Sequence, residues 1–192
     1  CNNTSPIFIM NFLVWKTLDR KELLLPSLVI LLGTPVVMSF PFRKIYKSGR
    51  KRGGGRNTLG MQRNYIMKKK SVESCMMDSF ETIVKVGGYL IIFSVLLELA
   101  EQTGQKNIAA TLLLSTLEVT NGILMIAKRF PEISTAYPLL IGLTSMGGIC
   151  SMAQTQLMIR GTGLKLSDYI IQKLATAMAA SGFAILYAKF NF

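Results

Sequence analysis

Residues 112–126 read LLLSTLEVTNGILMI and hold one carboxylate, Glu118, inside an apolar run. Glu118 is also the one charged residue of the stretch 107–127, which is long enough to cross a bilayer as a helix. A carboxylate at mid-bilayer depth costs about 2.5–3.5 kcal/mol, so it persists where it faces a cavity, a partner or a proton. Glycine tolerates the positive φ of an unwound turn. We therefore expect the chain to unwind at Asn121-Gly122, with Glu118 lining a wet cavity; a structural Glu118 bonded to a neighbouring helix is the alternative.

Similar apolar runs occur along the whole chain. Half of the 192 residues are hydrophobic and the mean hydropathy is +0.39, which is too apolar for an ordinary soluble domain. Runs of about 18 or more residues with few charges are candidate membrane-crossing helices. Besides 107–127, such runs cover residues 23–40, 83–100, 133–159 and 169–188. The sequence predicts an all-α, polytopic membrane protein.

The residues that most enzymes and metal sites need are scarce. The chain contains no histidine, and its three cysteines, Cys1, Cys75 and Cys150, lie far apart without a paired spacing. This pattern favours neither a disulfide framework nor a zinc site, and no nucleophile–base pair is visible. We expect no enzyme and no cofactor, apart from a coupling cation or proton.

The positive charge is concentrated in one segment. Residues 43–70 hold eleven of the 22 Lys and Arg residues and no acid, in a chain of net charge +12. Such a segment either binds nucleic acid or anionic lipid, or is a cytoplasmic loop that follows the positive-inside rule. Because apolar runs flank it on both sides, we favour the loop and expect no nucleic-acid partner. It divides the chain into residues 1–47, a basic cytoplasmic linker over 48–70, and a second membrane part over 71–192.

The second part opens with an apolar stripe. Val72, Met76, Phe80 and Ile83 fall at helical spacing on one face. This spacing indicates either an amphipathic helix on the membrane surface or the cytoplasmic end of the next spanning helix. Gly87-Gly88 then permits a close helix contact or a kink.

A double glycine interrupts the run 133–159. Hydrogen-bonding side chains, among them Ser151 and Gln154, gather on both sides of Gly147-Gly148. Small residues alone would suit tight helix packing, but this arrangement favours a discontinuous helix. Two adjacent interrupted helices are a sequence signal of the substrate site in a transporter.

The start of the chain supplies a third polar segment. Four polar residues precede Pro6, which suits the first turn of a helix. A helix cap explains one of them but not all four, so we include them in a site. The candidate substrate-binding residues are Asn2, Asn3, Thr4, Ser5, Glu118, Thr120, Asn121, Gly147, Gly148, Ser151 and Gln154.

Four stretches, taken in order, carry a family resemblance. They read CNNTSPIF (1–8), DSFETIVKVGGYLIIFSVL (78–96), TLEVTNGI (116–123) and GGICSMAQ (147–154). Together they resemble the C-terminal half of the sporulation integral membrane protein family YlbJ, also called SpoVV. The second stretch resembles the start of a nucleoside-recognition, or Gate, domain, and the family is related to concentrative nucleoside transporters.

This resemblance implies a fold of inverted repeats with re-entrant hairpins and broken helices. Residues 1–47 would end the first repeat with a broken helix and a spanning helix, and 71–192 would form the Gate-type domain. The segment with Glu118 would be the second re-entrant hairpin, GGICSMAQ the broken helix after it, and NNTSP its counterpart in the first repeat. The hairpin that precedes NNTSP in the family is not in this chain, which leaves a missing N-terminal repeat or a homo-oligomer open.

The resemblance also implies a function and a location. It predicts transport of a small polar or anionic metabolite, dipicolinic acid, across the outer forespore membrane of a sporulating bacterium. A charged Glu118 would repel the two carboxylates of dipicolinate, so a proton or cation on Glu118 would be needed. The alternatives are a nucleoside-type transporter, whose substrate hydroxyls suit a carboxylate, and a non-transporting membrane scaffold in spore assembly. A third alternative is an electrostatic tether to a membrane or to nucleic acid.

The topology of residues 106–192 stays open at this stage. Lys128-Arg129 on one side and Arg160 with Lys165 on the other give nearly balanced charge. The positive-inside rule therefore allows both a hairpin and a full span for this part of the chain.

Overall fold

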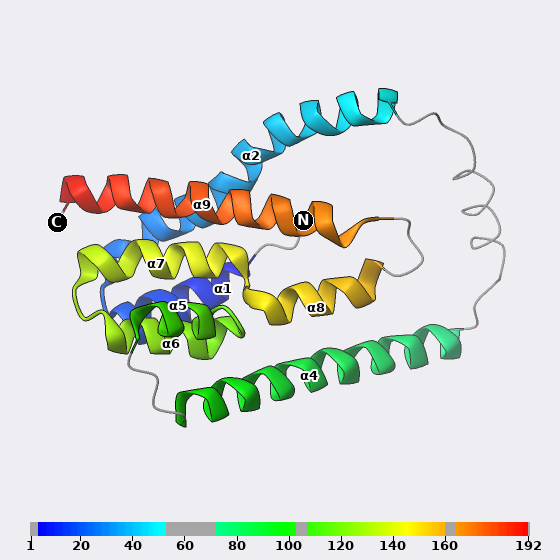
Figure 1. The fold of residues 1–192 in the computed structure, drawn as a ribbon, viewed down its shortest axis with the longest axis horizontal. Helices are drawn as coiled ribbons and strands as arrows, with labels where there is room; N and C mark the ends of the chain where they lie inside the picture. Colours follow the sequence, from blue (N-terminus) through cyan, green and yellow to red (C-terminus); the bar gives the residue numbers. More distant parts are fainter. Residues whose placement is uncertain (1–3, 53–71, 103–106, 160–163, 192) are drawn as a thin grey trace.

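The computed structural model describes residues 4–52, 72–102, 107–159 and 164–191, and within these ranges the chain is helical with no strand (Figure 1). The predicted all-α class is confirmed for this part of the chain. The region expected to form the basic linker falls largely outside the described residues, as do Asn2 and Asn3.

Four helical stretches among the described residues are long and apolar enough to cross a membrane. Helix α2 (Leu24–Arg52) follows a short 3-10 turn, η2 (Lys21–Leu23), and α4 (Val72–Gln102) is the longest. Helices α7 (Ile133–Met146) and α8 (Gly148–Ile159) together form an interrupted third stretch, and α9 (Leu166–Asn191) is the fourth. At a rise of 1.5 Å per residue, each stretch exceeds the roughly 30 Å of a bilayer core. These lengths are compatible with an integral membrane protein.

The fifth apolar run is not one continuous helix. Residues 107–127 divide into α5 (Ile108–Ser115) and α6 (Val119–Arg129), joined by the turn 116–118 into a helical hairpin. These helices are only about 12 and 17 Å long, well short of a bilayer core. The chain leaves the helix at the turn, where Glu118 takes an extended conformation.

The first described segment is also interrupted. Helix α1 (Pro6–Phe8) has its proline in the first turn, as predicted, and continues as a π-helix, η1 (Ile9–Leu18). The Thr17 hydroxyl donates to the Phe12 carbonyl five residues earlier, at 2.8 Å, which matches the wider winding of a π-helix. The segment ends at Asp19, whose φ of 49° is left-handed.

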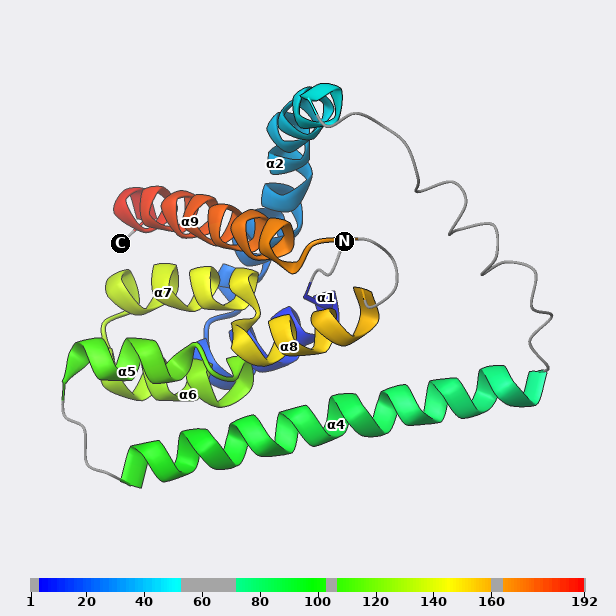
Figure 2. The same ribbon diagram turned by 45° about the vertical axis from the view of Figure 1, so that its right-hand side comes forward.

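The core forms around α7. Tyr137, Leu140 and Ile141 are fully buried, and α9 runs beside α7 in both views (Figures 1 and 2). A small-residue contact permits this approach, since a Cβ on Gly142 would lie 3.2 Å from the Cβ of Ser181. Helix α2 joins the core where the Ser27 hydroxyl lies 3.3 Å from the Tyr137 hydroxyl.

Helix α4 lies at the edge of the bundle. It is continuous from Val72 to Gln102, so the apolar stripe at its start belongs to one long helix. The alternative of a separate amphipathic helix on the membrane surface is wrong. Leu97 is its one buried residue, and nothing in the described part of the chain outside the helix's own nearby backbone lies within 4 Å of a Cβ built on Gly87 or Gly88. Its large exposed apolar surface suits contact with lipid.

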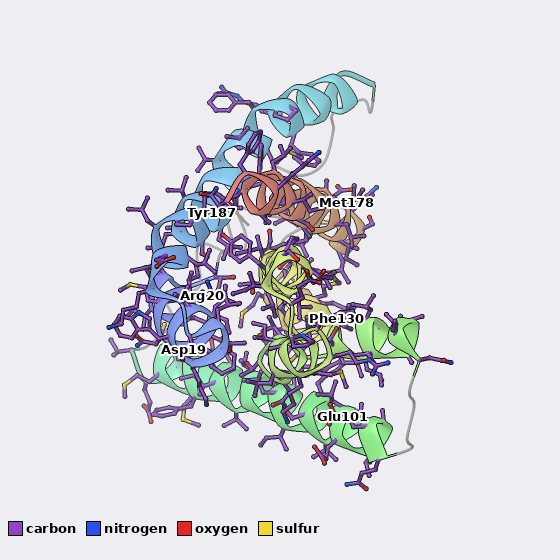
Figure 3. All side chains as sticks on the ribbon, turned by 90° about the vertical axis from the view of Figure 1, so that its left-hand side faces the viewer. Asp19, Arg20, Glu101, Phe130, Met178 and Tyr187 are labelled. Atoms are coloured by element: carbon purple, nitrogen blue, oxygen red, sulfur yellow. The ribbon has the colours of Figure 1, made fainter. Side chains whose placement is uncertain are left out.

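The two ends of α4 lie at opposite ends of the molecule (Figures 1 and 2). In Figures 1 and 2, α4 begins at the right-hand end and finishes at the left, where α7 begins. Figure 3 looks onto this left-hand end, with Asp19 and Arg20 at the turn between η1 and α2 and Glu101 near the end of α4. Charged residues thus mark the end where the hairpin of α5 and α6 opens.

Candidate functional site

The two helix breaks contact each other through their backbones. The N–H of Ile149 donates to the carbonyl of Thr116 at 2.7 Å, and the N–H of Cys150 donates to that of Leu117 at 2.9 Å. The carbonyls belong to the hairpin turn, and the N–H groups belong to the first turn of α8. Helix ends leave such groups without intrahelical partners. Here the hairpin turn supplies the acceptors for the N–H groups of α8, and α8 supplies the donors for the carbonyls of the turn. The breaks form one structural unit, although the hydrogen-bonded residues are 33 positions apart in the sequence.

The predicted break at the double glycine is confirmed. Gly147 and Gly148 have φ values of 81° and 76°, a left-handed conformation that L side chains rarely adopt. Gly148 is needed for a second reason, because a Cβ there would lie 3.0 Å from the Thr116 carbonyl oxygen. The double glycine therefore both interrupts the helical span and lets the hairpin turn approach α8.

Glu118 caps its own helix. Its two carboxylate oxygens accept hydrogen bonds from the backbone N–H groups of Thr120 and Asn121, each at 2.8 Å, and the residue is 2% exposed. A carboxylate at the positive end of a helix is stabilised by these donors and by the helix dipole. The partner of Glu118 is thus neither a cavity nor a neighbouring helix, the two possibilities that the sequence suggested, but the N-terminus of α6.

The expected unwinding at Asn121-Gly122 is wrong. Both residues lie inside α6, and the chain unwinds on the other side of Glu118. Gly122 is required by packing: a Cβ there would lie 2.1 Å from the carbonyl oxygen of Ser115. Glycine thus lets α6 pass close to the last turn of α5.

Two other candidate side chains form contacts between or within helices. The Asn121 amide donates to the Ser94 hydroxyl of α4 at 3.3 Å, and the Gln154 amide donates to the Cys150 sulfur at 3.3 Å. Thr120 is half-buried and gives its backbone N–H to Glu118. In this structure these three residues take part in the framework around the breaks.

A cavity of about 280 Å³ lies beside the α7–α8 break. The start of the chain closes one side of it, because the Thr4 hydroxyl donates to the Thr144 carbonyl of α7 at 3.0 Å. The lining combines hydroxyl groups, an apolar wall and one ammonium group. It consists of Thr4, Ser5, Phe8, Val119, Thr144, Gly147, Ser151 and Lys173.

The cavity unites part of the predicted site. Thr4, Ser5, Gly147 and Ser151 line it, so the first described residues lie beside the double-glycine break. Glu118 is not among the lining residues, and its carboxylate accepts hydrogen bonds from the N-terminus of α6.

Lys173 is a charged residue within the apolar run 169–188, it was not among the predicted site residues, and it lines the cavity. Its ammonium nitrogen lies 3.4 Å from the carbonyl oxygen of Ser145, in the last turn of α7. The signal was present in the sequence, because an ionisable residue within an apolar run is a functional candidate by default. The same reasoning had been applied to Glu118 alone.

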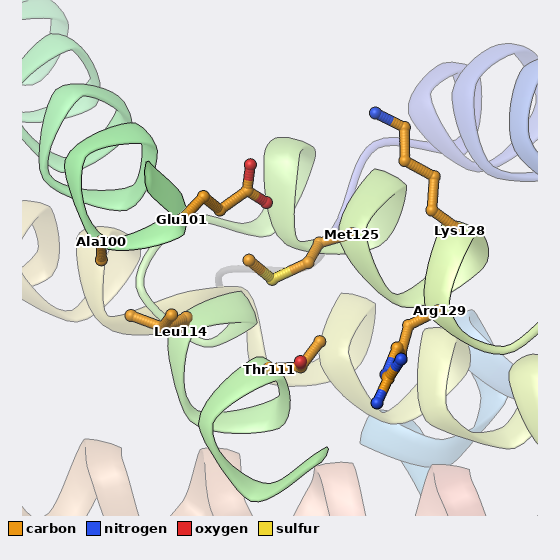
Figure 4. Close-up of a pocket in the computed structure, with 7 residues that line it drawn as sticks. All are labelled: Ala100, Glu101, Thr111, Leu114, Met125, Lys128 and Arg129. Carbon is orange, nitrogen blue, oxygen red and sulfur yellow. The ribbon is translucent and has the colours of Figure 1, made fainter. Parts of the chain in front are cut away.

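A second cavity, of about 340 Å³, lies at the open end of the hairpin (Figure 4). Glu101 of α4 and Lys128 and Arg129 of α6 contribute its charges, beside apolar side chains such as Met125. Charged helix ends of this kind are typical of a membrane–water interface. Since no helix break borders it, we place the candidate site at the first cavity.

No protein-family model, curated protein or solved structure matches this chain. The resemblance to the YlbJ family stays a prediction that rests on the four quoted stretches.

Proposed function

We propose that this chain is part of a membrane transporter for a small polar or anionic metabolite. The observation that carries the proposal is the meeting of three segments at one cavity: the residues before and in α1, the first residue of α6 after the hairpin turn, and the double-glycine break, which the hairpin turn contacts through its backbone. Irregular backbone at membrane depth is tolerated where protein buries it or where it borders a water-filled cavity. Secondary transporters place their substrate sites at such discontinuous helices.

The lengths of the helices support a site near the bilayer midplane. Helices α7 and α8 are about 21 and 18 Å long, so the break lies close to the middle of the interrupted span. We take the hairpin of α5 and α6 as re-entrant, since neither helix is long enough to cross. Placing hydroxyl groups and an ammonium group at this depth costs free energy, so they are expected where they bind a substrate or line a transport pathway.

The family resemblance suggests which substrate to test first. It points to dipicolinic acid and to the outer forespore membrane, within a fold of inverted repeats. A nucleoside is the alternative substrate, and a non-transporting scaffold in spore assembly is the alternative function. A scaffold has no need of a polar cavity at the meeting of three segments, which favours transport.

Uptake into lipid vesicles tests the proposal. Vesicles with the full chain should accumulate labelled dipicolinate or uridine above empty vesicles. Ser151→Phe should lower uptake at least about tenfold, because the ring would fill a cavity of about 280 Å³. Gln156→Phe is the matched control, since Gln156 is exposed on the same helix. Uptake equal to that of empty vesicles for both solutes would favour the scaffold instead.

A further inference from the structure

An apolar groove lies between α2 and α9. Its volume of about 720 Å³ falls within the roughly 300–1,000 Å³ of typical ligand sites. Helix α9 contributes Phe183 and Tyr187, and α2 contributes residues from Leu25 to Val37. Among the described residues, the groove shares no lining residue with the cavity at the α7–α8 break, so it is a separate feature of the molecule.

One face of α2 forms the floor of the groove. The lining positions 25, 29, 33 and 37 recur every four residues, so they lie on the same side of the helix. Gly33 has no side chain, and in the described part of the chain nothing beyond the helix's own nearby backbone lies within 4 Å of a Cβ built there. The Thr34 hydroxyl donates within its own helix, to the carbonyl four residues earlier, at 2.6 Å. The floor is therefore apolar and open at its middle.

The charge of the groove lies at one end. Glu22, just before α2 begins, is the one charged residue among the described residues that line the groove. It belongs to the exposed segment 19–22, Asp-Arg-Lys-Glu, which holds two acids, two bases and no net charge. A charged turn at the start of an apolar helix is typical of the membrane–water interface. The groove therefore begins at headgroup level and continues into the apolar part of a bilayer.

The length of the groove matches one leaflet. From Glu22 to Val37 the chain advances by about 22 Å at 1.5 Å per residue. A bilayer is about 40–45 Å thick with its headgroups, so one leaflet is about 20–22 Å. The later part of α2 runs away from α9 in Figures 1 and 2. A second spanning helix would need a contact through both leaflets, whereas one lipid needs only this length.

We propose that the groove binds a phospholipid with an ethanolamine headgroup, its acyl chain along α2 and its ammonium at Glu22. The carboxylate accepts hydrogen bonds from the ammonium, and the two bases before it supply positive charge for the phosphate. A segment without net charge thus complements a headgroup without net charge. Phosphatidylglycerol is a net anion and has no ammonium. The inference requires a membrane but not transport, so it goes beyond the proposed function.

Two lipids with the same acyl chains isolate the headgroup. Phosphatidylethanolamine and phosphatidylglycerol are titrated separately into the detergent-solubilised full chain, and the bound fraction is measured by native mass spectrometry. We expect phosphatidylethanolamine to bind at least about fivefold more tightly. Glu22→Gln should remove this preference by weakening phosphatidylethanolamine alone. Glu73→Gln is the control and should keep the preference, because Glu73 is an exposed acid in the first turn of α4, outside the groove.

Gly33 tests the groove itself. Gly33→Leu places a side chain in the middle of the groove without a clash, so it should weaken both lipids at least about fivefold. Gly87→Leu is the matched control, since Gly87 is also half-buried within a long helix and open to a Cβ, but lies on α4. It should leave both affinities within about twofold of the unchanged protein. Circular dichroism confirms that each variant is folded.

The outcomes separate the headgroup from the groove. Equal affinities for the two lipids in the unchanged protein would overturn the role of Glu22, and this comparison needs no variant. Unchanged lipid binding in Gly33→Leu would overturn the groove as the site. A mass of two chains that is lost in Gly33→Leu would show that a second copy, rather than a lipid, occupies the groove.

Discussion

At the scale of single residues, two charges in apolar runs have opposite roles. Glu118 and Lys173 both interrupt apolar stretches, and the cost of burying a charge marks both as candidates. The structure gives Glu118 the backbone donors of α6 and places Lys173 on the wall of the cavity. Spacing alone cannot separate these roles, because the difference depends on where the helix begins. Glutamate is also an unusual N-cap, since shorter polar side chains are preferred there.

The cap at Glu118 can be tested by removing it. Glu118→Ala leaves the N–H groups of Thr120 and Asn121 without their buried acceptors, so we expect a loss of about 1–2 kcal/mol in the free energy of unfolding. Amide hydrogen exchange at these two residues should become faster. Glu118→Gln keeps one acceptor oxygen and should lose less.

Glu132 provides the matched control for this prediction. It occupies the same N-cap position on α7, but it is exposed and its side chain makes no capping hydrogen bond. Glu132→Ala should leave the free energy of unfolding within about 0.5 kcal/mol of the unchanged protein. Equal effects from the two alanine variants would show that the Glu118 cap contributes nothing specific.

At the scale of elements, the sequence predicted one break correctly and misplaced the other. The double glycine at 147–148 was recognisable because polar side chains flank it and both residues need left-handed φ values. Asn121-Gly122 gave the same signal, yet Gly122 is helical and serves a close approach to Ser115. Sequence shows that a position requires glycine without showing whether conformation or packing is the reason.

The packing role of Gly122 predicts a clear difference between two glycine variants. Gly122→Ala would place a Cβ 2.1 Å from the Ser115 carbonyl oxygen, which forces the two hairpin helices apart. We expect a loss of roughly 2 kcal/mol or more, seen as a lower midpoint of thermal unfolding. Gly182→Ala in α9 meets nothing within 4 Å, so it should leave the midpoint unchanged or raise it. A midpoint for Gly122→Ala equal to that of Gly182→Ala would contradict the close contact.

At the scale of the whole molecule, the sequence predicted most of the long helices but not how they meet. Apolar runs at 23–40, 83–100 and 169–188 all fall within long helices, because length and hydropathy decide those elements. The contact between the hairpin turn and α8 depends on backbone groups about 30 residues apart, which leave no pattern in the side chains. The same holds for the contact of Thr4 with α7. These long-range contacts create the cavity, so the fold class was predictable from sequence and the composition of the site only in part.

The arrangement of the helix ends predicts the orientation of the chain in a membrane. The basic segment 43–70 precedes α4, so the positive-inside rule places the beginning of α4 in the cytoplasm. Cys75 lies there and is exposed, whereas Glu132 lies between α6 and α7 at the opposite end of the molecule (Figures 1 and 2). With Cys1 and Cys150 replaced by serine, a membrane-impermeant maleimide should label Cys75 only from the cytoplasmic face.

The opposite end completes this test of topology. A cysteine introduced at Glu132, with Cys75 also replaced, should react only from the non-cytoplasmic face, because a hairpin of two short helices returns to the side from which it entered. A full span through residues 107–127 would reverse the expected side of every later helix end. In the proposed arrangement, α4 crosses the membrane once, and the hairpin of α5 and α6 turns back at the α7–α8 break. Labelling of positions 75 and 132 from the same face would exclude this arrangement.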